Sequence, residues 1–129
     1  MLAIKSWIYG KLSGDSALVA LLGDTGHISD AWPEVFTIFP MVIYQDDNQQ
    51  DWEWSDNIPL GTSARIRVDI FTKNISGMPT TVDIGMEIAR IFRINLFNCG
   101  SNGEVFDPTE GVRHRVMRFS RGIFPGQLV

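Results

Sequence analysis

The residue types with the most potential for chemistry lie in one acidic and aromatic segment, Gln45 to Asp56. It contains five carboxylates and two indoles but no basic residue: Asp46, Asp47, Asp51, Glu53 and Asp56, with Trp52 and Trp54. Adjacent carboxylates can bind a hard cation, but calcium loops alternate their ligands around a glycine turn, which this segment lacks. A solvated acidic segment that carries indoles is instead typical of a surface that another protein covers. We therefore predict a protein contact here and no metal site.

Two other interpretations of Trp52 and Trp54 are open. The indoles could line a pocket together with the nearby carboxylates, which would make the chain a small ligand-binding α+β domain. They could also pack back onto their own domain as a satellite cluster, because indoles are usually well covered in folded proteins.

The only cluster of basic residues in the sequence consists of Arg113, Arg115, Arg118 and Arg121. Arginine clusters bind phosphate, so a nucleic-acid-binding module is one interpretation. The net charge of −4 and the lack of an aromatic RNA-binding signature beside these arginines make it the weaker one. We treat the four residues as a candidate basic interface.

No arrangement of residues typical of an enzyme is present. The sequence has no G-x-S-x-G elbow, its two histidines, His27 and His114, are far apart, and Cys99 is its single cysteine. Gly100 to Gly103 lacks the lysine and the following helix of a phosphate-binding loop. We expect no catalytic residue, no cofactor and no metal, and a structural role for His114. Without a signal peptide or a membrane-spanning run, we expect a protein of the reducing cytoplasm.

The N-terminal elements follow from apolar spacing and turn residues. Apolar residues at helical spacing predict an amphipathic helix over residues 2 to 12, ending near Gly14. Asp15 or Ser16 is expected to cap a second helix over residues 17 to 22, with Gly23 as its left-handed terminator. A short strand is expected between residues 27 and 32.

A long antiparallel hairpin is predicted in the middle of the chain. The apolar run 39 to 44 carries Pro40 at its start, where a strand tolerates proline. Residues 62 to 73 alternate, with Ala64, Ile66, Val68 and Ile70 on one side and Arg65, Arg67, Asp69 and Phe71 on the other. The acidic segment is then a turn-like connection at the tip of the hairpin.

One long helix and one strand complete the predicted fold. Residues 80 to 83 resemble a capping box and begin a helix that runs to about residue 98. Its circumference is mostly apolar, so we expect it to be covered on more than one side. Residues 100 to 103 are expected to form a tight connection, and residues 111 to 123 the last strand, with a break in phase at Arg118 and Phe119.

This order predicts an α+β fold in one domain, residues 1 to 129. A mostly antiparallel sheet would carry the N-terminal short helices and one long helix on one face. Charge is uneven along the chain, with a net −7 over residues 1 to 60 and +3 over residues 61 to 129. If these charges separate in space, an acidic patch on one subunit could meet a basic patch on the next.

Several strings in this order resemble the tail completion and tail terminator proteins of long-tailed bacteriophages and prophages, which are head-tail joining proteins. The resemblance rests on residues 17 to 23, 39 to 44 and 64 to 71, the acidic connection and the long helix. It implies a non-enzymatic virion structural protein of the tail, which forms a ring of six copies. Such a ring ends the tail tube and joins it to the head connector.

The resemblance also implies partners and a location. The partners would be further copies of the chain, the tail tube protein and the head connector or neck protein, with assembly in the bacterial host cytoplasm and no membrane. DNA would pass the lumen without specific binding, and an acidic lining would repel its phosphates. The indoles favour a grip on a partner instead. A neck stopper or a minor tail protein would have a similar sequence pattern.

Overall fold

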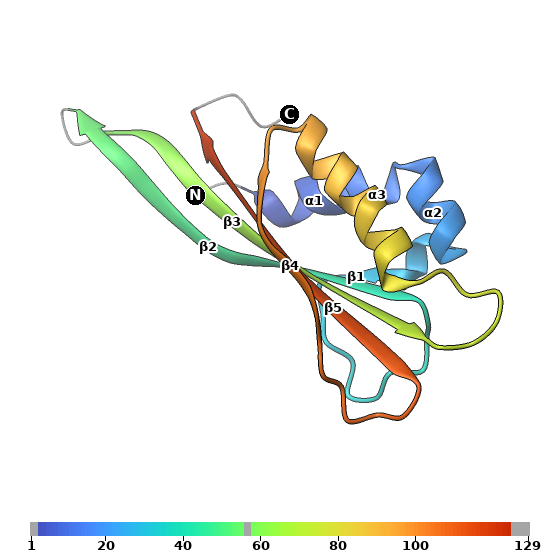
Figure 1. Ribbon diagram of the computed structural model, residues 1–129. Helices are drawn as coiled ribbons and strands as arrows, with labels where there is room; N and C mark the ends of the chain where they lie inside the picture. The colour runs from blue at the N-terminus through green and yellow to red at the C-terminus, as the bar shows by residue number, and fades with distance from the viewer. Residues whose placement is uncertain (1–2, 56–57, 125–129) are drawn as a thin grey trace.

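The computed structural model describes residues 3–55 and 58–124 and shows an α+β fold (Figure 1). The helices in this part of the chain are α1 (Ile4–Ser13), α2 (Ser16–Leu22) and α3 (Thr81–Ile94), with one 3-10 turn, η1 (Thr25–His27). The strands are β1 (Ile28–Ser29), β2 (Met41–Ser55), β3 (Ile58–Lys73), β4 (Asn98–Val105) and β5 (Val112–Ile123). They form one sheet in the order β1-β2-β3-β5-β4, in which only the β1–β2 pair is parallel.

The two N-terminal helices form as predicted. The Asp15 side chain accepts a hydrogen bond from the Leu18 amide at 2.9 Å and caps α2, and Gly23 ends the helix with a φ of 93°. Ile4, Ile8 and Leu12 share the buried face of α1. The strand expected between residues 27 and 32 is confirmed only at β1, because the 3-10 turn takes up His27.

The predicted hairpin of β2 and β3 is confirmed, but the acidic segment is not a turn-like connection. Its residues up to Ser55 continue β2, so that Asp51 pairs with Thr62 and Trp54 with Pro59 in the antiparallel ladder. The register shifts once, between Asp46 and Asn48, where β2 accommodates an extra residue. The hairpin therefore extends past the end of β5, whose pairing with β3 stops at Thr62, and projects from the rest of the molecule (Figure 1).

Helix α3 begins with the predicted capping box, in which Thr80 and Asp83 exchange side-chain-to-backbone hydrogen bonds. It ends at Ile94, earlier than the expected residue 98, because Leu96 adopts a left-handed conformation with a φ of 68°. Gly85 allows the helix to approach the sheet closely. A Cβ at this position would lie 3.3 Å from Cδ of Arg115 and 3.4 Å from Sδ of Met117.

Two predictions for the C-terminal part are wrong. The segment 100 to 103 is no tight connection but lies inside β4, where the ladder with β5 outweighs the turn preference of its glycines, serine and asparagine. Arg118 and Phe119 do not break the last strand, since β5 pairs with β3 in one continuous register. A bulge does occur at this level of the sheet, but in the facing strand: β4 carries an extra residue between Cys99 and Ser101, opposite Phe119 and Arg118. The sequence of residues 124 to 129 predicts an irregular tail, which lies outside the described residues except for Phe124.

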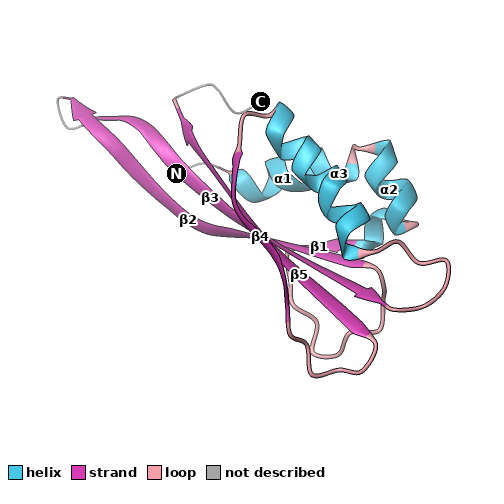
Figure 2. Ribbon diagram, viewed as in Figure 1, coloured by secondary structure: helices cyan, strands magenta, loops and turns pink. Residues whose placement is uncertain are grey.

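The sheet separates two apolar clusters of different size. All three α-helices cover one face (Figure 2), where the main core joins them to alternate residues of β3, including Ile66, Val68 and Ile70. On the other face, Met41, Ile43 and Phe71 form a small second core beneath the segment between β1 and β2, which contributes Phe36 and Phe39. The predicted alternation of β3 is thereby confirmed.

Candidate interaction surfaces

The predicted acidic contact is described only at its beginning. Asp46 lies at the bulge in β2, where its Oδ2 accepts a hydrogen bond from Nε2 of Gln49 at 2.6 Å, and Asp47 is exposed beside it. The backbone of Asp51, Trp52, Glu53 and Trp54 belongs to β2, but their side chains lie outside the described part of the structure. Asp56 lies outside the described residues altogether. The interface role of this segment stays a prediction.

The structure divides the predicted basic interface between the two faces of β5. Arg113, Arg115 and Arg121 lie on the helix side: Arg113 pairs with Glu104 at 3.2 Å, and Nη1 of Arg121 donates to the Asn95 carbonyl oxygen at 3.0 Å. Arg118 lies on the opposite face, opposite Arg67 of β3. The four arginines are therefore not one continuous surface, because successive strand residues point to opposite faces.

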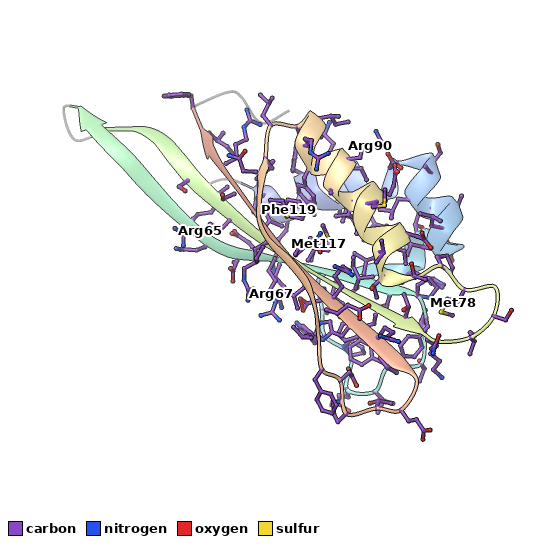
Figure 3. The ribbon with its side chains drawn as sticks, viewed as in Figure 1. Arg65, Arg67, Met78, Arg90, Met117 and Phe119 are labelled. Carbon is purple, nitrogen blue, oxygen red and sulfur yellow. The ribbon has the colours of Figure 1, made fainter. Side chains whose placement is uncertain are left out.

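A different basic patch forms on the sheet face away from the helices. Arg65 and Arg67 of β3 point to this side (Figure 3) and join Arg118 of β5. Arg65, Arg118 and Asp47 border an open hollow of about 410 Å³. The alternation of β3 places Arg65 and Arg67 on one face, but their proximity to Arg118 depends on the β3–β5 register, which no local pattern reveals. We call Arg65, Arg67 and Arg118 the arginine face.

Beside the arginine face lies a buried polar group. The side chain of Asp69 is only 1% exposed; its Oδ1 accepts a hydrogen bond from Nε of Arg67 at 2.8 Å, which raises the pKa of that guanidinium. Nε2 of His114 lies 3.6 Å from Oδ2 of Asp69, and neither atom has a hydrogen-bond partner among the described residues. The His114 ring stacks on Phe71 at 4.1 Å and meets the edge of Trp32. These contacts pack the His114 ring between Phe71 of β3 and Trp32 of the segment between β1 and β2.

A groove lies on the helix side, between α3 and strands β4 and β5. It encloses about 250 Å³, and its apolar lining comes from Val82, Gly85, Met86 and Ala89 of α3. Val82 and Met86 are 48% and 69% exposed. The α3 helix is covered on more than one side, as expected, by the sheet and by α1 and α2, whose contacts include Trp7 with Phe92 and Asp15 with Arg90. The part of α3 that carries Val82 and Met86 is not covered in the described monomer. We call this feature the α3 groove.

Cationic side chains border the α3 groove. Arg115 donates from Nη1 to Oδ1 of Asn102 at 2.8 Å and from Nε to Oγ1 of Thr81 at 3.3 Å, so it is held without a direct carboxylate contact. Arg93 is exposed and has no ion pair with the described residues. The nearby Glu104 is ionised readily, because the Thr81 hydroxyl and the guanidinium groups of Arg113 and Arg115 lower its pKa.

Exposed apolar side chains also lie at the end of the sheet that is opposite the projecting hairpin. Phe106, in the loop that joins β4 to β5, is 88% exposed, and Val35, in the segment between β1 and β2, is 71% exposed. Glu34, Val35, Asp107 and Thr109 border one shallow pocket, so the two segments lie side by side. Glu110 adds a third carboxylate. We call residues 106 to 110 the Phe106 loop.

Within the described ranges, no group of three His, Cys, Asp or Glu side chains is arranged to hold a metal ion. No helix in the same ranges has the length and apolar character needed to cross a membrane. The described part of the chain has a set of unlike surfaces: a projecting hairpin, an arginine face, a groove with an apolar α3 side and cationic borders, and an aromatic loop with acidic neighbours.

Comparison with known proteins gives a likeness in fold. No protein-family model matches the chain, and no curated protein matches its sequence. A solved chain of the "Virion of native gene transfer agent (GTA) particle" has a similar structure, with a TM-score of 0.68 and 16% sequence identity. The likeness covers 95% of this chain and 95% of that chain, so the two share the whole arrangement of helices and strands.

Proposed function

We propose that this chain is a structural protein of a bacteriophage or prophage virion, a tail terminator or tail completion protein that forms a ring. The observation that carries the proposal is the fold shared along 95% of both chains with a component of a gene transfer agent virion. The resemblance of the sequence to tail completion and tail terminator proteins supports the same class. In this role the chain is not an enzyme and acts through protein contacts alone.

A ring requires two different patches on each subunit, because each copy must offer one patch to the preceding copy and another to the following one. Several features suit this requirement. Beyond Ile43, where its pairing with β1 ends, β2 has no strand partner on its outer edge in the described chain. An unpaired edge can hydrogen-bond to another chain. The hairpin that carries this edge also projects from the rest of the molecule (Figure 1), which suits a contact with a neighbouring copy.

The ring, which we expect to contain six copies, would stop the tail tube by binding its last layer. Its other side would accept the head connector or neck protein, and DNA would pass through the lumen without specific binding. The acidic part of the hairpin suits either the lumen, where it would repel phosphate, or a partner surface that takes Trp52 and Trp54 as anchors. The indoles favour the partner surface.

Size-exclusion chromatography with light scattering, followed by negative-stain imaging, tests the proposal. We expect ring particles of a single stoichiometry at high protein concentration or upon addition of purified tail tubes. A chain that stays monomeric at every concentration, and that forms no ring on tail tubes, would exclude the function. A gene position directly before a major tail protein would favour a terminator over a neck stopper or a minor tail protein.

A further inference from the structure

We propose that the Phe106 loop of one copy inserts into the α3 groove of the next copy, and that this contact joins neighbouring subunits. The inference rests on the proposed function, because it identifies the surfaces through which a ring would close. Its occupant is therefore a second copy of this chain.

The groove is large enough for an aromatic side chain and has apolar residues on its α3 side. Its volume is about 250 Å³, whereas an apolar cavity of roughly 150 Å³ already admits a benzene ring. Val82, Met86 and Ala89 supply apolar contacts, and methionine adapts its shape to an inserted ring. Gly85 lines the groove where the helix packs closely on Arg115 and Met117.

The loop offers an aromatic side chain that its own subunit leaves uncovered. Phe106 is 88% exposed, the largest exposure among the large apolar residues of the described chain. Its position is fixed from both ends, since β4 reaches Val105 and β5 begins at Val112. The Asp107 side chain accepts a hydrogen bond from the Thr109 amide at 2.8 Å, which shapes the turn. A loop held in this way loses less conformational entropy when it binds.

The charges of the two surfaces are opposite. Arg93 and Arg115 border the groove without direct carboxylate partners, whereas Asp107 and Glu110 belong to the same loop as Phe106. Opposite potentials of this kind orient two subunits and select the correct face. A groove with acidic borders would instead repel the loop.

The Phe106 loop cannot bind the α3 groove of its own subunit. The Phe106 loop lies at the end of the sheet beyond the helices, while α3 lies across one face of the sheet (Figure 1). A contact between unlike patches leaves one loop and one groove free in every dimer. Such a contact continues from copy to copy until the ring closes.

Two substitutions test the contact, Phe106→Asp in the loop and Met86→Asp in the groove. Both residues are largely exposed, so each variant is expected to fold, with a thermal unfolding midpoint close to that of the unchanged chain. Each variant alone should be monomeric by sedimentation velocity. The matched control Ile75→Asp alters another exposed apolar residue, which does not line the groove, and should form rings.

A mixture of the two variants gives the decisive result. The Phe106→Asp chain keeps its groove and the Met86→Asp chain keeps its loop, so an equimolar mixture should form dimers that contain one copy of each and grow no further. The proposal is overturned if either variant alone still forms rings, or if the mixture stays monomeric. Disruption by Met86→Asp alone, with no effect of Phe106→Asp, would also overturn it, because the groove would then hold a different segment.

The unchanged chain separates this inference from the proposed function. If it forms rings and both variants do as well, the contact is wrong while the function stands. If the unchanged chain and the Ile75→Asp control stay monomeric at every concentration and on tail tubes, the function fails, and the contact fails with it.

Discussion

Arg67 and Arg118 occupy directly opposed positions on β3 and β5, so two cationic side chains leave neighbouring positions on the sheet face away from the helices. Like charges in opposed strand positions destabilise a sheet, whereas opposite charges stabilise it. Asp69 neutralises Arg67 in part, through the hydrogen bond to its Nε. Arg118 has no carboxylate partner of this kind among the described residues. A carboxylate in place of Arg118 would therefore replace a like-charge pair with an opposite-charge pair.

We therefore expect Arg118→Glu to raise the free energy of unfolding by about 0.2–1 kcal/mol, the range of a cross-strand charge pair. Urea denaturation measures the effect. Arg121→Glu is the matched control, because Arg121 donates to the Asn95 carbonyl on the other face and lies over the Phe97 ring. This control should lower the stability. A loss of stability in Arg118→Glu would show that Arg118 has a stabilising partner in the fold.

Asp15 links helix α2 to α3, since its carboxylate both caps α2 and pairs with Arg90. Removal of the cap in Asp15→Ala should cost about 0.5–2 kcal/mol at neutral pH. Thermal or urea unfolding at pH 7 measures this cost. Ser16→Ala is a suitable control, because Ser16 is exposed at the start of the same helix. Equal stability of the Asp15 variant and the unchanged chain would contradict a role for this cap.

The Asp15 carboxylate also makes the stability of the fold depend on pH. Burial alone would raise the pKa of Asp15, but the Leu18 amide, Glu87 and Arg90 lower it overall. A carboxyl whose pKa is lower in the folded state stabilises the fold above its unfolded pKa of about 4, and this contribution disappears as the pH falls through the folded value. The stability difference between the unchanged chain and Asp15→Asn should therefore be largest above pH 4 and shrink toward pH 2. A difference that grows on acidification would reverse the sign of this linkage.

Local sequence patterns predict those parts of the fold whose cause is local. The cap at Asp15, the terminator Gly23 and the capping box of Thr80 and Asp83 each depend on neighbours within a few residues, and each is confirmed. The alternation of β3 is confirmed because one face of that strand is buried. These local features are enough to predict an α+β fold, even when the pairing of the strands is not known.

The pairing of β2 with β3 was predicted, but the extent of β2 and the existence of β4 were not. Asp, Asn, Gly and Ser disfavour strands. The sequence therefore predicted connections, and not strands, at the acidic segment and at residues 100 to 103. Each becomes a strand because a distant partner, β3 or β5, supplies its ladder of hydrogen bonds. The arginine face and the α3 groove likewise unite residues from separate elements. Apolar α3 residues beyond those that the sheet, α1 and α2 cover were the local sign of the groove.

The double substitution of Trp52 and Trp54 by alanine separates an interface role from a core role. Their backbone lies where the hairpin extends past β5, so we expect little change in the unfolding midpoint and weaker assembly. A loss of several kcal/mol would instead identify the indoles as packed residues. Trp7→Ala is the control, because Trp7 lies against Phe92 and Phe97 in the main core and its removal should destabilise the monomer.

Glycine-to-alanine substitutions in two helices test the close approach of α3 to the sheet. In Gly10→Ala the new Cβ meets no atom within 4 Å, so the variant should gain about 0.5–1 kcal/mol from helix propensity. In Gly85→Ala the same gain is opposed by contacts at 3.3 Å to Arg115 and 3.4 Å to Met117. We expect Gly85→Ala to be less stable than Gly10→Ala in urea denaturation. Equal gains at both positions would mean that α3 can move away from β5 without cost, and that the floor of the α3 groove is not fixed by Gly85.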